Sequence, residues 1–173
     1  MSRWLYLGLI LLVAFQRSTE LRLARRNERL ARAAGAIEFG AGHFPWMVAI
    51  HTSFLISCVA EVWLLERPFA PPAAGAMLLL LGIATALRYW AISTLGERWT
   101  TRILVRPGVP LVTGGPYRFL RHPNYLAVVL EIAALPLVHG AWLTAVVFSV
   151  ANAVLLMVRI RAENAALASH AGG

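Results

Sequence analysis

Long apolar stretches alternate with short polar ones along the chain. The apolar runs predict membrane-spanning segments at about residues 4–15, 44–65, 73–95, 124–138 and 141–158. The first run is short for a bilayer core of about 30 Å, because a helix rises only about 1.5 Å per residue. We expect that helix to continue through residues 16–34, which contain no Pro or Gly, with its apolar side on the membrane. The pattern therefore predicts an all-α integral membrane protein with about five transmembrane helices.

The composition favours burial in a bilayer over burial in a soluble core. Of the 173 residues 59% are hydrophobic, and the mean hydropathy is +0.67. A soluble domain of this length has too small a core to hide that much apolar surface. The single cysteine, Cys58, lies in an apolar run without metal-ligand neighbours, so we expect a packing role and no metal site. The N-terminus resembles a signal peptide but has no convincing cleavage site, which indicates a retained helix.

The distribution of arginine predicts the orientation. The formal net charge is +8, and the chain has neither Lys nor Asp. Because the arginines lie next to apolar spans, anionic lipid head groups are the expected partner, and nucleic acid is not. Most of them fall in 16–34, in the polar section 96–121 and near the C-terminus, and five spans place these three segments on one side. The positive-inside rule predicts that this side is cytoplasmic and that the N-terminus is outside.

The densest group of polar and turn-forming residues lies just before the fourth predicted span. Residues 111–125 read Leu-Val-Thr-Gly-Gly-Pro-Tyr-Arg-Phe-Leu-Arg-His-Pro-Asn-Tyr. By itself the segment is also compatible with interfacial anchoring, with Tyr117 and Tyr125 in an aromatic belt. After the fifth span, Arg159 and Glu163 are four residues apart and share one face of a helix, as either a surface ion pair or part of a site. We expect one domain over 1–173, with N-terminal helices in 1–95 and the part that contains these candidate site residues in 96–173.

These elements in combination resemble a known family. Three elements follow one another in the chain: Gly-Pro-Tyr-Arg-x-x-Arg-His-Pro-Asn-Tyr, a helical hairpin, and Arg159-Ile-Arg-Ala-Glu163. In this order they resemble the isoprenylcysteine carboxyl methyltransferase family, which consists of membrane enzymes that use S-adenosylmethionine. A bacterial branch of that family is similar to further elements of this chain, namely Gln16-Arg-x-x-Glu20, Arg26-Asn27, Gly35-Ala36-x-Glu38 and His43. The resemblance then covers nearly the whole length.

The resemblance implies a site for S-adenosylmethionine. The positions that it assigns to the cofactor are Arg102, Val109, Pro110, Leu111, Val112, Tyr117, His122, Pro123, Asn124, Tyr125 and Glu163. Arg159 matches a position assigned to the acceptor substrate. The residue types suit the ligand: a histidine can hold its carboxylate, a glutamate can accept from its amino group or a hydroxyl, and a tyrosine ring can face its sulfonium.

Ionisable residues inside the predicted spans are a second signal. Such groups are costly in a membrane and are functional by default. The alternative is pairing between helices, for example of Glu131 with Arg88. A phenol or enol acceptor benefits from a base, whereas a carboxylate acceptor needs none. Glu131 is the favoured base by position, and His51 is a second candidate.

The resemblance implies O-methylation of a lipophilic acceptor in the bacterial inner membrane. An alkylated phenol or pyrone is favoured, because the bacterial branch often accompanies type III polyketide synthases; the carboxylate of a prenylated cysteine is the other choice. One alternative is an NADPH-dependent membrane reductase of the sterol reductase kind, with a 2′-phosphate held by Arg118, Arg121 and Arg159. A non-enzymatic membrane scaffold is the remaining alternative.

Overall fold

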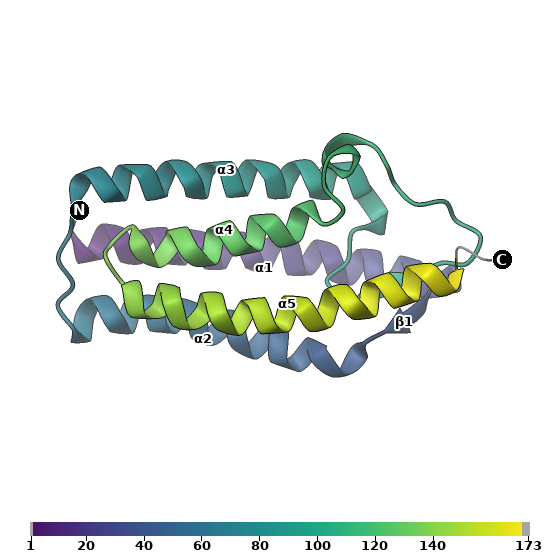
Figure 1. Ribbon diagram of the computed structural model, residues 1–173, viewed down its shortest axis with the longest axis horizontal. Helices are drawn as coiled ribbons and strands as arrows, with labels where there is room; N and C mark the ends of the chain where they lie inside the picture. Colours follow the sequence, from purple (N-terminus) through teal and green to yellow (C-terminus); the bar gives the residue numbers. More distant parts are fainter. Residues whose placement is uncertain (1, 171–173) are drawn as a thin grey trace.

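Five helices lie side by side in an elongated bundle (Figure 1). The computed structural model describes residues 2–170, and the helices are α1 (Arg3–Ala33), α2 (Phe44–Leu64), α3 (Pro71–Leu95), α4 (Pro123–Leu137) and α5 (Trp142–His170). Among the described helices, α2, α3 and α5 are long and apolar enough to cross a membrane, whereas α4 has only 15 residues. The predicted all-α membrane architecture with five helices is confirmed.

The outside of the bundle is apolar. Leu12 on α1, Ile56 on α2, Leu79 on α3 and Val146 on α5 are each more than half exposed. A contiguous apolar surface of this kind is unusual on a soluble monomer and is what a lipid-facing surface requires. The helices meet over a core that includes Tyr6, Phe54, Ile132, Leu135 and Val138.

Proline and glycine fix where several helices begin. Pro45, Pro71 and Pro123 lie in the first turn of α2, α3 and α4, where a missing N–H costs no helical hydrogen bond. The turn from α4 to α5 contains Gly140 at φ +71°, and a Cβ there would lie 2.9 Å from the carbonyl oxygen of Pro68. A glycine is therefore needed for the tight hairpin that α4 and α5 form.

A two-stranded sheet was not predicted from the sequence. β1 (Ile37–Phe39) pairs with β2 (Ile103–Val105) in antiparallel register, with Glu38 opposite Leu104. Residues 109–112, which the resemblance assigns to the cofactor, lie outside the sheet and are irregular. The sheet joins the segment that follows α1 to the polar section that precedes α4, and so holds the two together.

The polar segments gather at one end of the bundle. Figure 1 shows the second half of α1, the sheet, the long connection between α3 and α4 and the end of α5 at the end away from the N-terminus. That connection contains the short 3₁₀ helices η2 (Gly96–Arg98) and η3 (Gly115–Arg118). We call this the polar end. The three arginine-rich segments therefore share one end, as the sequence predicted.

Candidate active site

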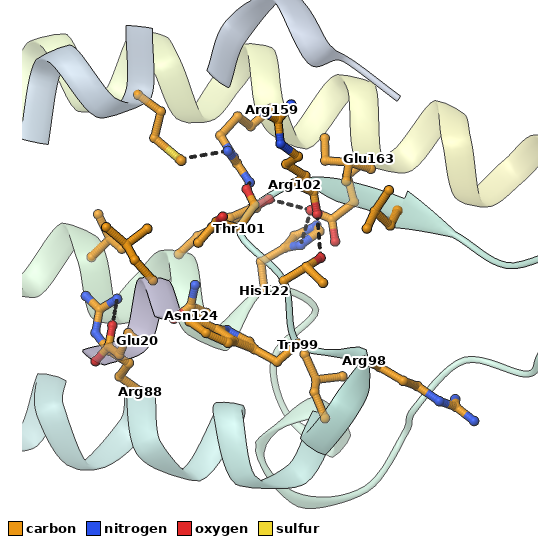
Figure 2. A pocket seen from close by; sticks show the side chains of 18 of the residues that line it. Glu20, Arg88, Arg98, Trp99, Thr101, Arg102, His122, Asn124, Arg159 and Glu163 are labelled. Atoms are coloured by element: carbon orange, nitrogen blue, oxygen red, sulfur yellow. Dashed lines mark hydrogen bonds and ion pairs between the residues drawn. The ribbon is translucent and has the colours of Figure 1, made fainter. Parts of the chain in front are cut away.

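A cavity of about 1400 Å³ extends from the polar end into the bundle. Residues of all five helices and of β2 line it. Pockets for a single drug-sized ligand commonly have volumes of about 300–1,000 Å³. The cavity therefore has room for more than one ligand. Figure 2 shows its two parts, with Glu20 and Arg88 toward the bundle interior and His122, Arg159 and Glu163 toward the polar end.

The structure brings together nearly all the side chains that the sequence singled out. All eleven residues implied for the cofactor line the cavity: Arg102, Val109, Pro110, Leu111, Val112, Tyr117, His122, Pro123, Asn124, Tyr125 and Glu163. Arg159 lines it as well, whereas Glu131 is not among the described residues of its wall. The roles of these residues remain predictions; their convergence on one cavity is the structural finding.

His122, Tyr125 and Glu163 form one contact group at the polar end. Pro123 begins α4, so His122 precedes the helix and Tyr125 lies in its first turn. The two rings stack with centroids 5.2 Å apart. The Tyr125 hydroxyl donates to Oε2 of Glu163 at 2.5 Å, and Nδ1 of His122 lies 3.7 Å from the same oxygen. The group joins the start of α4 to the C-terminal part of α5.

Arg159 is buried next to this group, with weak partners. Its Nη2 donates to the carbonyl of Thr101 at 3.0 Å, and its Nη1 points at the sulfur of Met47 at 2.8 Å. The guanidinium carbon lies 5.6 Å from the centroid of the Tyr125 ring. A thioether is a weak acceptor, and no ion pair between Arg159 and Glu163 occurs among the described residues. The positive charge is therefore only partly compensated.

Several buried polar atoms on the cavity wall have no hydrogen-bond partner in the described part of the chain. They are Nε of Arg17, Nε of Arg88, Nε2 of His122, Oδ1 of Asn124, Oδ1 of Asn152 and Nε of Arg159. Most buried polar atoms in proteins are hydrogen-bonded, and leaving one unsatisfied costs about 1–3 kcal/mol. Such a concentration of donors and acceptors on one wall indicates a site for a polar ligand. Asn152 was not predicted, although a lone amide in the apolar run of α5 was a visible signal.

Tyr117, in η3, completes the polar wall. Burial, reinforced by the nearby carboxylate of Glu163, raises the pKa of Tyr117 to about 12. The phenol therefore stays protonated at neutral pH and can donate a hydrogen bond.

Arg102, which the resemblance assigns to the cofactor, already has three partners within the protein. Its Nε lies 3.1 Å from Glu28, its Nη1 donates to Glu38 at 2.6 Å, and the guanidinium lies 4.0 Å from the centroid of the Phe44 ring. Burial opposes ionisation of Glu38, but hydrogen bonds from Arg32 and Arg102 outweigh it and lower the pKa of Glu38. Arg102 thus ties β2 to α1 and β1 while it also lines the cavity.

A second charged group lies deeper, between α1, α3 and α4. Oε2 of Glu131 lies 2.6 Å from Nη2 of Arg88 and 3.1 Å from Nη2 of Arg17, and Arg17 also contacts Glu20 at 2.6 Å. We call these four residues the intramembrane cluster. The pairing of Glu131 with Arg88, weighed as an alternative to a base, is present. Arg17 and Glu20 were not predicted as site residues.

The fold and the cavity define a helical membrane protein with a polar ligand site that continues into an apolar bundle. Residues 76–169 match the isoprenylcysteine carboxyl methyltransferase (ICMT) family, and the chain belongs to that family. The match runs from the second turn of α3 to the last turn of α5 and contains all the predicted site residues except His51. Membership points to a membrane methyltransferase.

Two relatives extend the similarity over the N-terminal helices. The uncharacterized protein YpbQ of Bacillus subtilis (strain 168) is 44% identical over 164 residues, which cover 95% of each chain. An uncharacterized protein of Haemophilus influenzae is 28% identical over 148 residues, 85% of this chain and 86% of its own. The match to the Bacillus subtilis protein therefore takes in α2 and most of α1 as well as the part of the chain that matches the family.

Proposed function

We propose that this protein is an S-adenosylmethionine-dependent O-methyltransferase whose acceptor is a lipophilic phenol, enol or pyrone. The observation that carries the proposal is the wall of unpaired polar atoms on His122, Asn124 and Arg159, in the part of the chain that matches a methyltransferase family. Bound S-adenosylmethionine supplies a methyl group on a positively charged sulfur. Methyl transfer needs alignment of donor and acceptor and exclusion of water rather than covalent catalysis by the protein.

The residues of the polar end fit this cofactor. Nε2 of His122 and Nε of Arg159 are unpaired groups near which a carboxylate is favourable, and Oδ1 of Asn124 is an unpaired acceptor for an amino or hydroxyl group. Glu163 holds the Tyr125 hydroxyl and so orients its ring, whose face is attractive to a cation. Donors, acceptors and an aromatic face are the groups that an amino acid, a ribose and a sulfonium require.

The inner part of the cavity fits an apolar acceptor. Leu55 on α2, Val128 on α4 and Leu155 on α5 line it, and the helices that they belong to carry apolar outer surfaces. An alkyl chain can lie there, next to the lipid, while its polar head points toward the cofactor. The total volume of about 1400 Å³ supports binding of both molecules together.

The arrangement of arginines does not favour the reductase alternative. Arg121 and Arg159 line the cavity, whereas Arg118 is not among the described lining residues and lies over the ring of Phe119. The three arginines expected around a 2′-phosphate therefore do not form one cluster.

Calorimetry on detergent-purified protein tests the cofactor. We expect S-adenosylmethionine to bind and NADPH not to bind. Transfer of a labelled methyl group to an alkylated phenol, with prenylated cysteine as the competing acceptor, tests the substrate class. Binding of NADPH without binding of S-adenosylmethionine contradicts the whole proposal, whereas exclusive methylation of prenylated cysteine contradicts the proposed acceptor and leaves a methyltransferase that acts on a carboxylate.

We also propose that the polar end faces the cytoplasm of a bacterial cell, where the cofactor is made. The support is the arginine content of that end and the positive-inside rule. Reporter fusions after Arg106 should be cytoplasmic and fusions after Phe69 external. The opposite result would separate the site from its cofactor.

A further inference from the structure

His51 has a free nitrogen that opens onto the cavity. Its Nδ1 lies 2.8 Å from the backbone carbonyl oxygen of Met47, one turn earlier on α2. A carbonyl only accepts, so the hydrogen bond places the proton of the neutral ring on Nδ1 and leaves a lone pair on Nε2. Nε2 has no partner among the described residues and is not one of the buried unpaired atoms, while His51 itself lines the cavity. The ring is therefore held in the form that can accept a proton from a ligand.

His51 lies between the two polar parts of the cavity. Met47 precedes it by one turn, and the sulfur of Met47 contacts Arg159 at the polar end. Arg17 and Arg88 of the intramembrane cluster line the same cavity as His51. A molecule that extends through this cavity from the intramembrane cluster to the polar end can therefore contact His51.

The intramembrane cluster offers two unpaired guanidinium N–H donors to that position. Arg17 and Arg88 each have a buried Nε without a partner in the described chain, and both line the cavity. Glu131 is in a different situation, because both guanidiniums contact its Oε2 and it does not belong to the described wall. The cluster has two positive and two negative side chains once Glu20 is counted, so an additional anion there meets no formal excess of negative charge.

We propose that His51 and the guanidiniums of Arg17 and Arg88 form the subsite for an acidic hydroxyl group of the acceptor, with His51 as the base. This inference rests on the proposed function and specifies its acceptor as a phenol or enol. The O–H bond breaks and its proton passes to Nε2 of His51. The oxygen forms a C–O bond to the methyl carbon as the C–S bond breaks and leaves its electron pair on sulfur. The imidazolium then returns the proton to water.

The subsite assigns different tasks to His51 and Glu131. Glu131 holds Arg88 and Arg17 in place and is a positioning residue, whereas Nε2 of His51 touches the reacting hydroxyl. A carboxylate acceptor is already ionised and gains nothing from such a base.

The first test compares two acceptors in full-length, detergent-purified protein. His51→Asn retains an amide N–H for the Met47 carbonyl and lacks the basic nitrogen. With a simple alkylphenol, whose pKa is about 10, we expect the rate to fall by roughly 10²–10⁴-fold. With an alkylated 4-nitrophenol, which ionises without help, we expect the rate to stay close to that of the wild type. Equal losses with both acceptors, or no loss with either, would overturn the assignment.

The pH profile gives an independent result. The wild-type rate with the alkylphenol should rise with pH as His51 loses its proton and then level off. The charged groups around His51 are Arg17 and Glu20 on α1, Arg88 on α3 and Glu131 on α4. In His51→Asn the level region should vanish, and the rate should rise until the phenol itself ionises. A wild-type profile retained in His51→Asn but lost in Glu131→Gln would make Glu131 the base instead.

A cofactor-free measurement separates binding from turnover. The absorbance of bound alkylated 4-nitrophenol reports its ionised fraction, which should be larger in the wild type than in the paired variant Arg88→Gln/Glu131→Gln at the same pH. An unchanged fraction contradicts the role of the guanidiniums.

His139→Gln is the matched control for His51→Asn, since His139 is buried between Tyr6 and Phe69 outside the described cavity wall. Cofactor binding in His51→Asn shows that the variant is folded, and failure of the wild type to bind S-adenosylmethionine would refute the proposed function rather than this subsite alone.

Discussion

At the end of the bundle near the N-terminus, the buried carboxylate of Glu61 has a partner for each oxygen. Oε1 accepts from Nε of Arg67 at 2.8 Å and from the backbone of Leu143 at 3.1 Å, while Oε2 accepts from the backbone of Thr144 at 2.6 Å. Leu143 and Thr144 lie in the first turn of α5, so Glu61 caps that helix from α2. Around the cavity, by contrast, buried atoms of Arg17, Arg88 and Arg159 are unpaired.

The contrast separates charges that stabilise the fold from charges that await a ligand. A buried ion with all its hydrogen bonds has no capacity for another molecule. An unpaired buried donor raises the free energy of the ligand-free protein. A ligand that accepts a hydrogen bond from this donor removes that free-energy cost. His139 is an exception outside the cavity, because both of its ring nitrogens are buried without a partner, between the rings of Tyr6 and Phe69.

The largest expected effect is on stability, at Glu61. Glu61→Ala leaves Arg67 and two backbone N–H groups without their acceptor, and breaking a buried pair of this kind costs about 3–5 kcal/mol. Thermal unfolding followed by tryptophan fluorescence should show a large fall in midpoint. S-adenosylmethionine should still bind with unchanged affinity at low temperature. Glu66→Ala, an exposed change nearby, is the control. A loss of affinity without a loss of stability would break the comparison.

The next effect should be on binding, at the polar end. His122→Ala and Glu163→Ala each remove one polar group from the proposed cofactor site, and the loss of such a partner typically costs about 1.5–3 kcal/mol, or about ten- to a hundredfold in affinity. Their unfolding midpoints should change little, because Nε2 of His122 is unpaired already and Glu163 is partly exposed. Calorimetry measures the affinity. Variants that unfold easily but bind normally would show that these residues are structural, like Glu61.

The sequence predicted the helices well because each helix is encoded by its own apolar run. Predicted spans 44–65 and 73–95 agree with α2 and α3 within about two residues, and the break after residue 34 agrees with the end of α1. The fifth predicted span, 141–158, covers only the apolar part of α5, and the helix continues through the polar residues beyond it, as the shared helical face of Arg159 and Glu163 implied. Hydropathy shows where an apolar run ends. A helix can continue beyond that residue, because it can leave the bilayer and extend into water.

The sequence was less informative where contacts join distant segments. Strands of three residues at 37–39 and 103–105 have no periodicity to detect, and each exists because the other is present. The intramembrane cluster likewise unites Arg17, Arg88 and Glu131 from three helices, and no local pattern specifies that meeting. The candidate site residues at the polar end came from a family resemblance rather than from periodicity, and the structure adds that they line one cavity.

The smallest expected effect concerns Glu38, which connects the sheet to the arginines of the polar end. Arg102 at 2.6 Å and Arg32 both hydrogen-bond to its carboxylate. Their hydrogen bonds, working against burial, lower the pKa of Glu38 below its ordinary value of 4.5. Because the folded pKa is depressed, the stabilisation is present above the ordinary value and is lost as pH falls through the folded one.

Glu38→Gln should therefore weaken the protein only slightly at neutral pH, by about 0.2–1 kcal/mol, since the partners are partly exposed and solvent screens the pairs. Unfolding midpoints measured between pH 7 and pH 3 should fall more steeply in the wild type than in Glu38→Gln, so that the two curves converge in acid. High salt should also reduce the difference at neutral pH, because it screens exposed charges. The opposite outcome is a loss of stability at neutral pH as large as that of Glu61→Ala. It would show that charged residues at the polar end also stabilise the fold, and the division between the two ends would no longer hold.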